Sequence, residues 1–342
     1  MRISVVIVNY NGATLLPDCL DGLEAQTRPA DEVIIVDNAS TDDSVPLLRQ
    51  RYPWTRIIES DTNLGFSEGN NLGIRASSGS IVVLLNNDTT PSPGFVEEIT
   101  GPLERDDQLS AVSGVMLFSE HVNTVATSGI KVFSNGLALD SDIGARWRDL
   151  PAEGGVFGPT GGAAAFRRSA LDDVELFPEP FFLYLEDVDL AWRLRLRGHR
   201  SVSRSAAWAL HIYSASSVEG STLKDYYLAR NRAWTLIRCW PDTLWRRFWP
   251  VILRYEFGAL AFALLTGRWA SLRGRMAGWA GVRRLCRVRA RIQRSVTADE
   301  QELLYWIHSA PSVRNVLRVR SVIRSMIESS DPGRTPDRGA NG

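Results

Sequence analysis

Three polar residues follow the apolar run Ile81–Leu85, and their types could bind a phosphorylated ligand together with a metal ion. They are Asn86, Asn87 and Asp88. A continuous run of β-branched residues and leucines is typical of a buried parallel strand. In open α/β sheets, ligands bind beyond the carboxyl ends of such strands. The alternative is a plain turn, because Asn and Asp favour turns and Pro91 follows.

The same pattern occurs twice earlier in the chain. Asn9 follows the apolar stretch Ile3–Val8, and Asp37 with Asn38 follows Glu32–Val36. We expect these groups too at the carboxyl ends of strands. The loop after the first stretch is not GxGxxG, which disfavours a dinucleotide-binding oxidoreductase. It also lacks the glycine-rich basic loop expected of a sugar nucleotidylyltransferase.

A cluster of acids opens a predicted helix that ends before Gly198. Glu186, Asp187 and Asp189 stand in its first turn, directly after an aromatic run that begins at Phe181. An aromatic wall beside carboxylates suits a sugar and a general base. The alternative is that the acids only stabilise the helix N-terminus. We expect Asp189 to cap this helix or to pair with an arginine.

Further candidates stand elsewhere in the chain. His211 follows another predicted strand, where it is either a site residue or a structural histidine. Gly162 belongs to a run of glycines and alanines that would allow close approach of a ligand, or simply close packing. Arg230 and Arg232 belong to a predicted helix and could reach a diphosphate, or serve the structure.

Alternating strands and helices are needed to position these residues. We predict strands at Ile3–Val8, Glu32–Val36, Arg56–Glu59 and Ile81–Leu85, and helices over residues 13–25, 43–51 and 63–76. Such alternation is typical of a parallel, Rossmann-like sheet. From residue 107 to residue 168 the alternation stops, and short apolar runs between glycines predict strands of a mixed sheet with long loops.

Composition narrows the class of protein. The chain has 342 residues, 44% of them hydrophobic, which fits a large domain with an appendage or two domains. Its three cysteines are far apart and form no CxxC motif, so neither a disulfide framework nor a zinc cluster is indicated. We expect a cytoplasmic protein, because the N-terminus lacks the pattern of a signal peptide.

The C-terminal part differs from the rest. We expect a first domain over residues 1–235, a helical region rich in Arg and Trp over 236–328, and a disordered tail over 329–342. Arginines recur from Arg238 to Arg294, which suits an amphipathic surface on anionic lipid; a tryptophan-rich core with a solvated basic face is the alternative. Arg254 and Glu256 interrupt its most apolar stretch, so we expect no membrane span.

Taken together, these motifs resemble family 2 glycosyltransferases of the GT-A fold, particularly the bacterial branch that includes rhamnosyltransferases. The resemblance covers about residues 3–235. It rests on an ordered set of motifs: Val5–Asn11, Val36–Asp42, Asn63–Phe66 with Asn70, Leu85–Thr89, Phe182–Arg193 and Arg230–Arg232. It implies a mixed central sheet flanked by helices, with a C-terminal helical extension.

The resemblance implies roles for the donor-side residues. Asn9 would line the nucleotide pocket, and Asp37 would accept a hydrogen bond from the pyrimidine. Asp88 matches the metal-binding end of the family's Asp-any-Asp motif, in which Asn86 replaces the first acid. The residues implied to contact substrate are Asn9, Asp37, Asn38, Asn63, Asn70, Asn86, Asn87, Gly162, Glu186, Arg230 and Arg232.

The resemblance also implies the chemistry. His211 would be a second ligand for Mg²⁺ or Mn²⁺, an imidazole favouring Mn²⁺. Asp187 would be the catalytic base that deprotonates the acceptor hydroxyl, and its place at a helix N-terminus should keep it ionised. Glu186 would orient or bind. Arg230 and Arg232 would contact the diphosphate.

We therefore expect a metal-dependent inverting glycosyltransferase that acts in cell-surface polysaccharide synthesis. The first donor expected is dTDP-L-rhamnose and the second a UDP-hexose, and the acceptor is a glycan or a polyprenyl-linked glycan. We expect a peripheral position at the inner face of the cell membrane, with anionic lipid as a further partner and no nucleic acid. A non-catalytic module that binds nucleotide sugar or carbohydrate is the alternative of another class.

Overall fold

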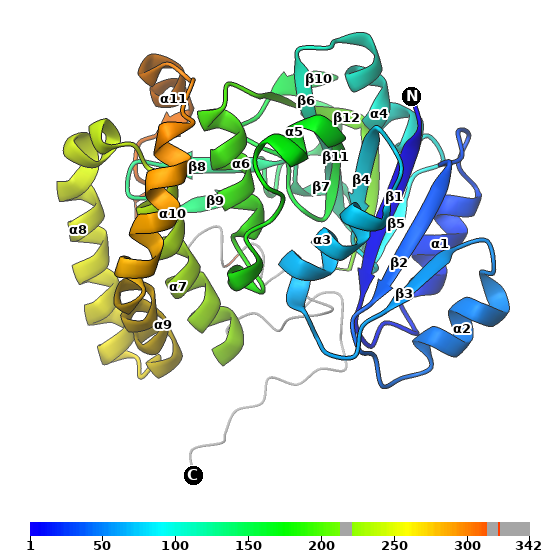
Figure 1. Cartoon of the computed structure of the whole chain (residues 1–342), viewed down its shortest axis with the longest axis horizontal. Helices are drawn as coiled ribbons and strands as arrows, with labels where there is room; N and C mark the ends of the chain where they lie inside the picture. Colours follow the sequence, from blue (N-terminus) through cyan, green and yellow to red (C-terminus); the bar gives the residue numbers. More distant parts are fainter. Residues whose placement is uncertain (213–220, 313–320, 322–342) are drawn as a thin grey trace.

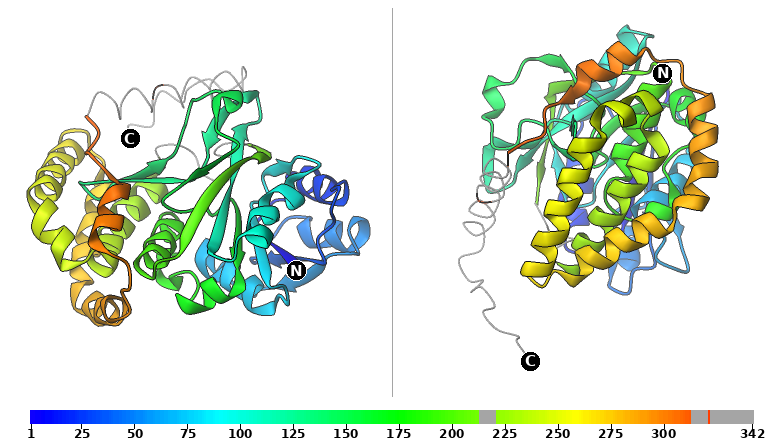
Figure 2. Two further views of the ribbon diagram at one scale, coloured as in Figure 1. Left: turned by 90° about the horizontal axis from the view of Figure 1, so that it is seen from above. Right: turned by 90° about the vertical axis from the view of Figure 1, so that its left-hand side faces the viewer.

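The computed structural model describes residues 1–212, 221–312 and residue 321. Figure 1 shows a sheet-containing part on the right, which carries the N-terminus, and a layer of helices, α8 to α11, on the left. The two perpendicular views in Figure 2 show the same division. The tail expected at residues 329–342 lies outside the described residues, as do residues 322–328 of the expected helical region.

A mixed sheet forms the centre of the first part, as predicted. Its strands run in the order β10-β12-β6-β11-β4-β1-β2-β3, with β5 on β12 and β7 on β6. The first four predicted strands form as β1 (Ile3–Asn9), β2 (Glu32–Asp37), β3 (Arg56–Glu59) and β4 (Ile81–Leu85), which pair in parallel. The others are β5 (Thr89–Pro91), β6 (Leu109–Phe118), β7 (His121–Thr127), β10 (Glu153–Gly155), β11 (Ala163–Arg167) and β12 (Arg200–His211).

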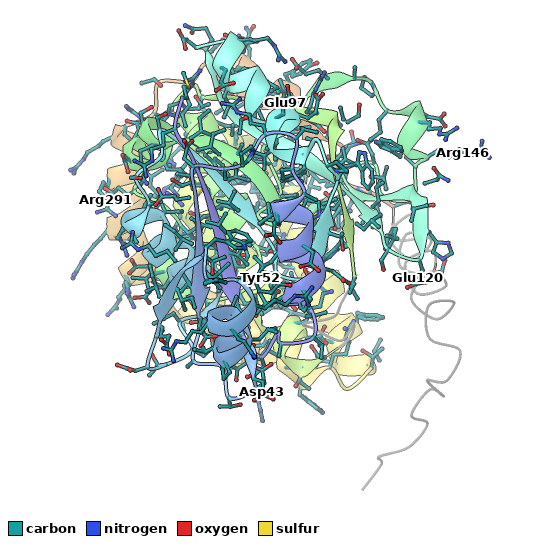
Figure 3. The ribbon with its side chains drawn as sticks, turned by 90° about the vertical axis from the view of Figure 1, so that its right-hand side faces the viewer. Asp43, Tyr52, Glu97, Glu120, Arg146 and Arg291 are labelled. Atoms are coloured by element: carbon teal, nitrogen blue, oxygen red, sulfur yellow. The ribbon has the colours of Figure 1, made fainter. Side chains whose placement is uncertain are left out.

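Helices cover both faces of this sheet because strand side chains alternate between two apolar clusters. One cluster joins odd positions of β1 to α1 (Leu16–Glu24), α2 (Ser44–Arg51) and α4 (Phe95–Arg105). The other joins Val6 to α3 (Gly65–Ala76), α5 (Arg168–Asp173) and α6 (Glu186–Leu196). Figure 3 looks onto the side of α1 and α2, where Tyr52 at the end of α2 donates a hydrogen bond to Asp21 of α1 (2.8 Å).

The region from residue 107 to residue 168 contains strands and loops, as predicted. It also supplies two members of a small second sheet, in the order β13 (Ile307–His308), β8 (Ile130–Phe133) and β9 (Ala138–Asp140). The 3-10 turns Trp147–Asp149 and Glu179–Phe181 complete this part. Because β13 comes from the far end of the chain, the second sheet ties the C-terminal region to the first part.

In the described C-terminal residues, the helices that follow are α7 (Thr222–Cys239), α8 (Asp242–Leu265), α9 (Trp269–Ala280), α10 (Val282–Arg294) and α11 (Glu300–Trp306). The boundary expected at residue 235 falls inside α7, so the structure has no break there. An apolar cluster around Trp192 of α6 and Trp240 joins the two parts. Contrary to our expectation, α8 is by length and composition apolar enough to cross a membrane, and only 17% of its most apolar window is buried.

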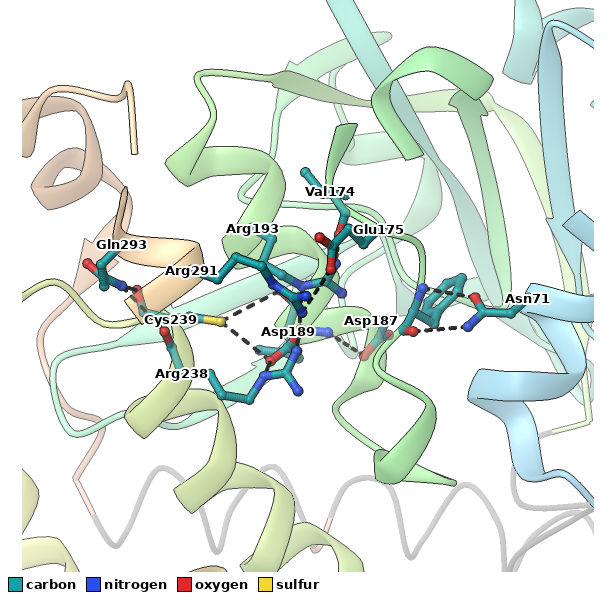
Figure 4. Close-up of polar contacts among 12 residues, drawn as sticks. Asn71, Val174, Glu175, Asp187, Asp189, Arg193, Arg238, Cys239, Arg291 and Gln293 are labelled. Atoms are coloured by element: carbon teal, nitrogen blue, oxygen red, sulfur yellow. Dashed lines mark hydrogen bonds and ion pairs between the residues drawn. The ribbon is translucent and has the colours of Figure 1, made fainter. Parts of the chain in front are cut away.

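A buried polar network fastens α6 to α7 (Figure 4). The Asp189 side chain has no solvent exposure, and it accepts hydrogen bonds from Arg193 Nε (2.7 Å) and Arg238 Nη2 (3.2 Å). The thiol of Cys239 donates to the same carboxylate (3.4 Å), and burial raises the pKa of that thiol well above its usual value. Asp189 therefore pairs with arginines, one of the two roles expected for it.

Candidate active site

The polar groups at the ends of β1, β2 and β4 form one connected layer. Asn9 Nδ2 donates to Asp37 Oδ1 (3.1 Å), and Asn87 Nδ2 donates to Asn9 Oδ1 (2.8 Å). Asp37 Oδ2 accepts from the backbone N–H of Ser40 (3.0 Å). Asn9 and Asp37 are both buried beneath the cavity wall, whereas Asn87 lines the cavity. The predicted gathering of these strand ends is therefore present.

Asparagines also shape the entrance to α3. Asn38 Nδ2 donates to Asn63 Oδ1 (3.0 Å), while Asn38 Oδ1 accepts from the backbone of Leu64 (2.7 Å). Asn63 Oδ1 further accepts from Gly65 N (2.9 Å). Asn38 and Asn63 line the cavity. Asn70 is buried and donates to the carbonyl of Phe66 within the helix (2.9 Å), so it supports the wall from behind.

Asp88 and His211 come together through the pairing of β5 with β12. The register places Thr89 opposite His211, which brings Asp88, the residue before Thr89, next to the imidazole. Asp88 Oδ1 lies 3.4 Å from His211 Nε2, and this oxygen is buried without a hydrogen-bond partner among the described residues. Both side chains line the cavity.

This pair fits a divalent metal ion. A buried carboxylate oxygen without a partner beside an imidazole offers the O and N donors that Mn²⁺ accepts, and the carboxylate alone suits Mg²⁺. Within the described part of the chain, no group of three or more His, Cys, Asp or Glu could hold a metal. Two protein ligands leave the remaining positions to ligand oxygens and water.

Close approach of two backbones sets the position of Asn86. Its N–H donates to the carbonyl of Gly162 (2.9 Å), and a Cβ added at Gly162 would lie 2.9 Å from Asn86 Nδ2. Of the two explanations offered for the small-residue run, close packing is visible here. Gly162 and Asn86 also line the cavity, so they remain available to a ligand.

Asp187 and Glu186 face the cavity from the start of α6. Burial raises the pKa of Asp187, although hydrogen bonds from the backbone N–H groups of Gly161 (3.1 Å) and Val188 (2.8 Å) lower it. Burial and the helix N-terminus therefore act in opposite directions on this carboxyl, and the expectation that Asp187 is ionised stays a prediction. Burial and the charge of Asp187 raise the pKa of Glu186 well above its usual value.

An unusual turn carries these acids into the cavity. Phe182, Tyr184 and Leu185 all have positive φ angles (67°, 67° and 64°), a conformation that costs a non-glycine residue free energy. The buried side chain of Asn231, on α7, holds the turn. Its Nδ2 lies within hydrogen-bond distance of the carbonyls of Leu183 (2.9 Å) and Tyr184 (2.7 Å). Sequence reasoning assigned no role to Asn231.

Both arginines beside Asn231 make contacts with the protein itself. Arg230 donates to the carbonyl of Phe181 (2.8 Å) and to Asn231 Oδ1 (2.8 Å). Arg232 is buried, forms an ion pair with Glu256 of α8 and lines the cavity. The structural alternative raised for these arginines therefore has direct support, and Arg232 is the one that still faces the cavity.

We predict that Asn231→Ala lowers the free energy of unfolding by about 3 kcal/mol, because it leaves buried carbonyls without donors. It should also reduce kcat by about 30-fold with little change in KM for the donor, because the turn that presents Asp187 loses its anchor. Thermal unfolding and steady-state kinetics test this. Asn71→Ala is the matched control: Asn71 is equally buried and bonds to both backbone groups of Phe177, so it should lose stability while keeping kcat. Equal kcat losses in the two variants would contradict a positioning role.

Asp140, at the end of β9, is a further cavity residue that sequence reasoning did not find. Its side chain keeps contact with solvent at the rim, yet desolvation by the surrounding protein and the charge of Asp187 raise its pKa to about 6. No sequence motif includes Asp140 or its immediate neighbours. The whole cavity measures about 1570 Å³.

The family follows from a comparison of the sequence. The family model described as Glycosyl transferase family 2 matches residues 4–175, half of the 342-residue chain. The chain belongs to glycosyl transferase family 2. The edge of β1, β2 and β4, with Asp88, lies within the matched residues, whereas Asp187, His211 and the helices α7 to α11 lie beyond them.

Several curated proteins are similar to this family 2 glycosyltransferase. The O-antigen biosynthesis protein RfbC of Myxococcus xanthus is 28% identical over 68% of this chain, but the match spans only 19% of RfbC. The N-acetylglucosaminyl-diphospho-decaprenol L-rhamnosyltransferase of Mycobacterium tuberculosis is 27% identical over 60% of this chain and 75% of its own length.

Solved structures support the fold. The mannosyltransferase PcManGT of Pyrobaculum calidifontis, in complex with GDP-Man and Mn²⁺, is 19% identical with a TM-score of 0.53, over 97% of this chain and 88% of that one. TarS residues 1–349 of S. aureus with UDP-GlcNAc is 15% identical with a TM-score of 0.53, over 98% and 93%. The predicted GT-A fold is confirmed.

Proposed function

We propose that this chain is a metal-dependent inverting glycosyltransferase that moves a sugar from a nucleoside diphosphate to a hydroxyl of a glycan. One observation carries the proposal. The Asp88–His211 pair, the strand-end asparagines and Asp187 all face the same cavity, so a metal-binding pair and a base of raised pKa share one site.

On the donor side, Asn38, Asn63 and Asn87 face the nucleotide, with Asn9 and Asp37 fixing them from below. We propose dTDP-L-rhamnose as the first donor, supported by the name of the mycobacterial relative, and a UDP-hexose as the second. Asp88 and His211 would hold the cation. When bound, Mg²⁺ or Mn²⁺ would neutralise the charge that develops on the departing diphosphate.

Asp187 acts on the acceptor. The acceptor oxygen forms a bond to the anomeric carbon as the bond from that carbon to the diphosphate breaks, and the hydroxyl proton passes to the Asp187 carboxylate. A raised pKa makes this carboxylate a stronger base than an exposed one. Glu186 stands beside Asp187 with its own pKa raised well above the usual value, and we assign it to binding or orienting the substrate.

The acceptor we propose is a glycan carried on a polyprenyl diphosphate, used in cell-surface polysaccharide synthesis. The mycobacterial relative is named for such an acceptor, and RfbC for O-antigen biosynthesis. A lipid-linked acceptor requires the enzyme to work at the membrane face. We therefore propose a peripheral position on the inner face of the cell membrane.

The outer face of α8 supports membrane contact. Trp249, Leu253 and Phe257 follow one another at helical spacing and are 53%, 43% and 68% exposed. Arg246 and Arg247 stand at the same end of the helix, on exposed positions. Exposed aromatic side chains flanked by arginines suit the interface of an anionic bilayer.

We predict that the double variant Trp249→Glu/Phe257→Glu weakens sedimentation with phosphatidylglycerol vesicles by at least about tenfold, since apolar burial is replaced by two like charges. Val122→Glu is the matched control, because Val122 is 51% exposed on β7, away from α8. A double variant that sediments like the wild-type protein would remove the membrane proposal.

Thermal stabilisation by nucleotides tests the proposed function most directly. A ligand that binds only the folded state raises Tm in proportion to its affinity. We expect dTDP or UDP species to raise Tm with Mn²⁺ present and much less with EDTA. Stabilisation by dinucleotides alone would overturn the proposal. Binding of nucleotide sugars without transfer to any acceptor would favour the non-catalytic module.

A further inference from the structure

The cavity is too large for the donor alone. Pockets for one small ligand usually measure about 300–1,000 Å³, whereas this one measures about 1570 Å³. It continues from the edge formed by the ends of β1, β2 and β4, here called the donor edge, to a second arm between α7, α8 and α9. In that arm Val251, Tyr255, Ala259 and Phe262 line the cavity. Their spacing places them on one face of α8, turned about the helix axis from the outer face.

The second arm combines this apolar face with excess positive charge. Arg232 and Arg275 both pair with the single carboxylate of Glu256, and Arg268 pairs with Asp225. Arg254 lines the cavity without an ion-pair partner in the described part of the chain. The four arginines therefore exceed the two acids, and the arm attracts an anion.

Unused polar atoms and open space in the arm indicate a ligand. Thr235 is buried and lines the arm, and its hydroxyl has no hydrogen-bond partner within the described residues. Phe262 lines the cavity yet is 48% exposed. Gly258 also lines the cavity, and a Cβ built there meets no atom of the described residues within 4 Å. Glycine is unfavourable inside a helix, and the space beside Gly258 leaves room for a ligand against α8.

We propose that this arm binds the lipid diphosphate part of the acceptor, with the arginines on the diphosphate and the apolar face of α8 on the first isoprenoid units of the chain. The inference rests on the proposed function and deepens it by assigning the acceptor a place. The continuity of the arm with the donor edge brings a sugar on that diphosphate to the cavity that Asp187 faces.

Isothermal titration calorimetry with two soluble lipid diphosphates tests the assignment. Farnesyl diphosphate and dimethylallyl diphosphate carry the same headgroup on a long and a short isoprenoid chain. Saturating dTDP or UDP with Mn²⁺ keeps both probes out of the donor site. We expect farnesyl diphosphate to bind at least about tenfold more tightly, because its longer chain is removed from water. Equal affinities would overturn the proposal.

Two variants locate the binding. Gly258→Trp should fill the arm and abolish the preference for the longer chain, while nucleotide affinity stays at the wild-type value. Leu264→Trp is the matched control, because Leu264 lies on the same helix, is 55% exposed and does not line the cavity. Arg254→Gln should weaken both probes by about the same factor, fivefold or so. A chain preference that survives Gly258→Trp would place the chain elsewhere and overturn the proposal.

The outcomes separate this inference from the function on which it rests. Nucleotide binding in the same calorimeter without any chain preference would remove only the lipid arm. Failure of every nucleotide to bind would remove the proposed function itself, whatever the lipid probes do.

Discussion

Replacing Asp187 with asparagine is expected to reduce sugar transfer by about 10³-fold, with donor affinity within about threefold of the wild-type value. Asparagine keeps the shape of the side chain and can still accept the hydrogen bond from Gly161 N, but it cannot take a proton. Measured kcat and the donor Kd test this. Glu186→Gln is the matched control, because Glu186 is the neighbouring acid in the first turn of α6 and is assigned only to binding or orientation, so its kcat should change far less.

The pH dependence of the wild-type enzyme provides a second check on Asp187. Its raised pKa means that the carboxylate becomes protonated at a higher pH than an ordinary aspartate, so activity is present above that pKa and is lost as pH falls through it. Asp187→Asn should lack this acidic limb. Undiminished turnover, or the same acidic limb in the variant, would remove Asp187 as the base.

Replacing Asp88 with alanine is expected to weaken donor binding by about 10²-fold when Mn²⁺ is present and very little in EDTA. Asp88 supplies a buried oxygen that faces His211 and has no hydrogen-bond partner among the residues the structure describes, so its loss would leave the cation with one protein ligand. Calorimetric Kd values for a nucleoside diphosphate, with Mn²⁺ and with EDTA, measure the effect. The variant with Mn²⁺ should resemble the wild-type protein with EDTA; full affinity with Mn²⁺ would refute the assignment.

The sequence predicted the donor edge well because its signals are local. A buried run such as Ile81–Leu85 ends in polar residues within the same short window, and parallel strands bring those ends together whatever the loops do. The pairing of Asp88 with His211 is different. It depends on a register between β5 and β12, strands that lie more than a hundred positions apart, and no local pattern encodes that register.

The conformation of the turn at residues 182–185, which carries Asp187 into the cavity, could not be predicted from the sequence for another reason. Phe182, Tyr184 and Leu185 have no intrinsic preference for positive φ, so their conformation is imposed by Asn231 and the packing around it. Burial of Asp187 likewise comes from tertiary packing, and no local sequence pattern indicates its effect on the pKa of that carboxyl. Propensity arguments fail where distant contacts override them.

The pairing of Arg232 with Glu256 bears on how this enzyme can be divided. Arg232 is adjacent in sequence to Asn231, whose side chain holds the turn at residues 182–185. The Arg232 guanidinium is buried against the carboxylate of Glu256 on α8. A chain cut before α8 would lose this carboxylate together with α9 and α10, which pack against α7, and would expose the apolar side chains of α6 and α7 that the terminal helices cover. The terminal helices are therefore not a detachable module: shuffling them between relatives requires exchanging α7 with them, and a shortened catalytic half is expected to fold poorly.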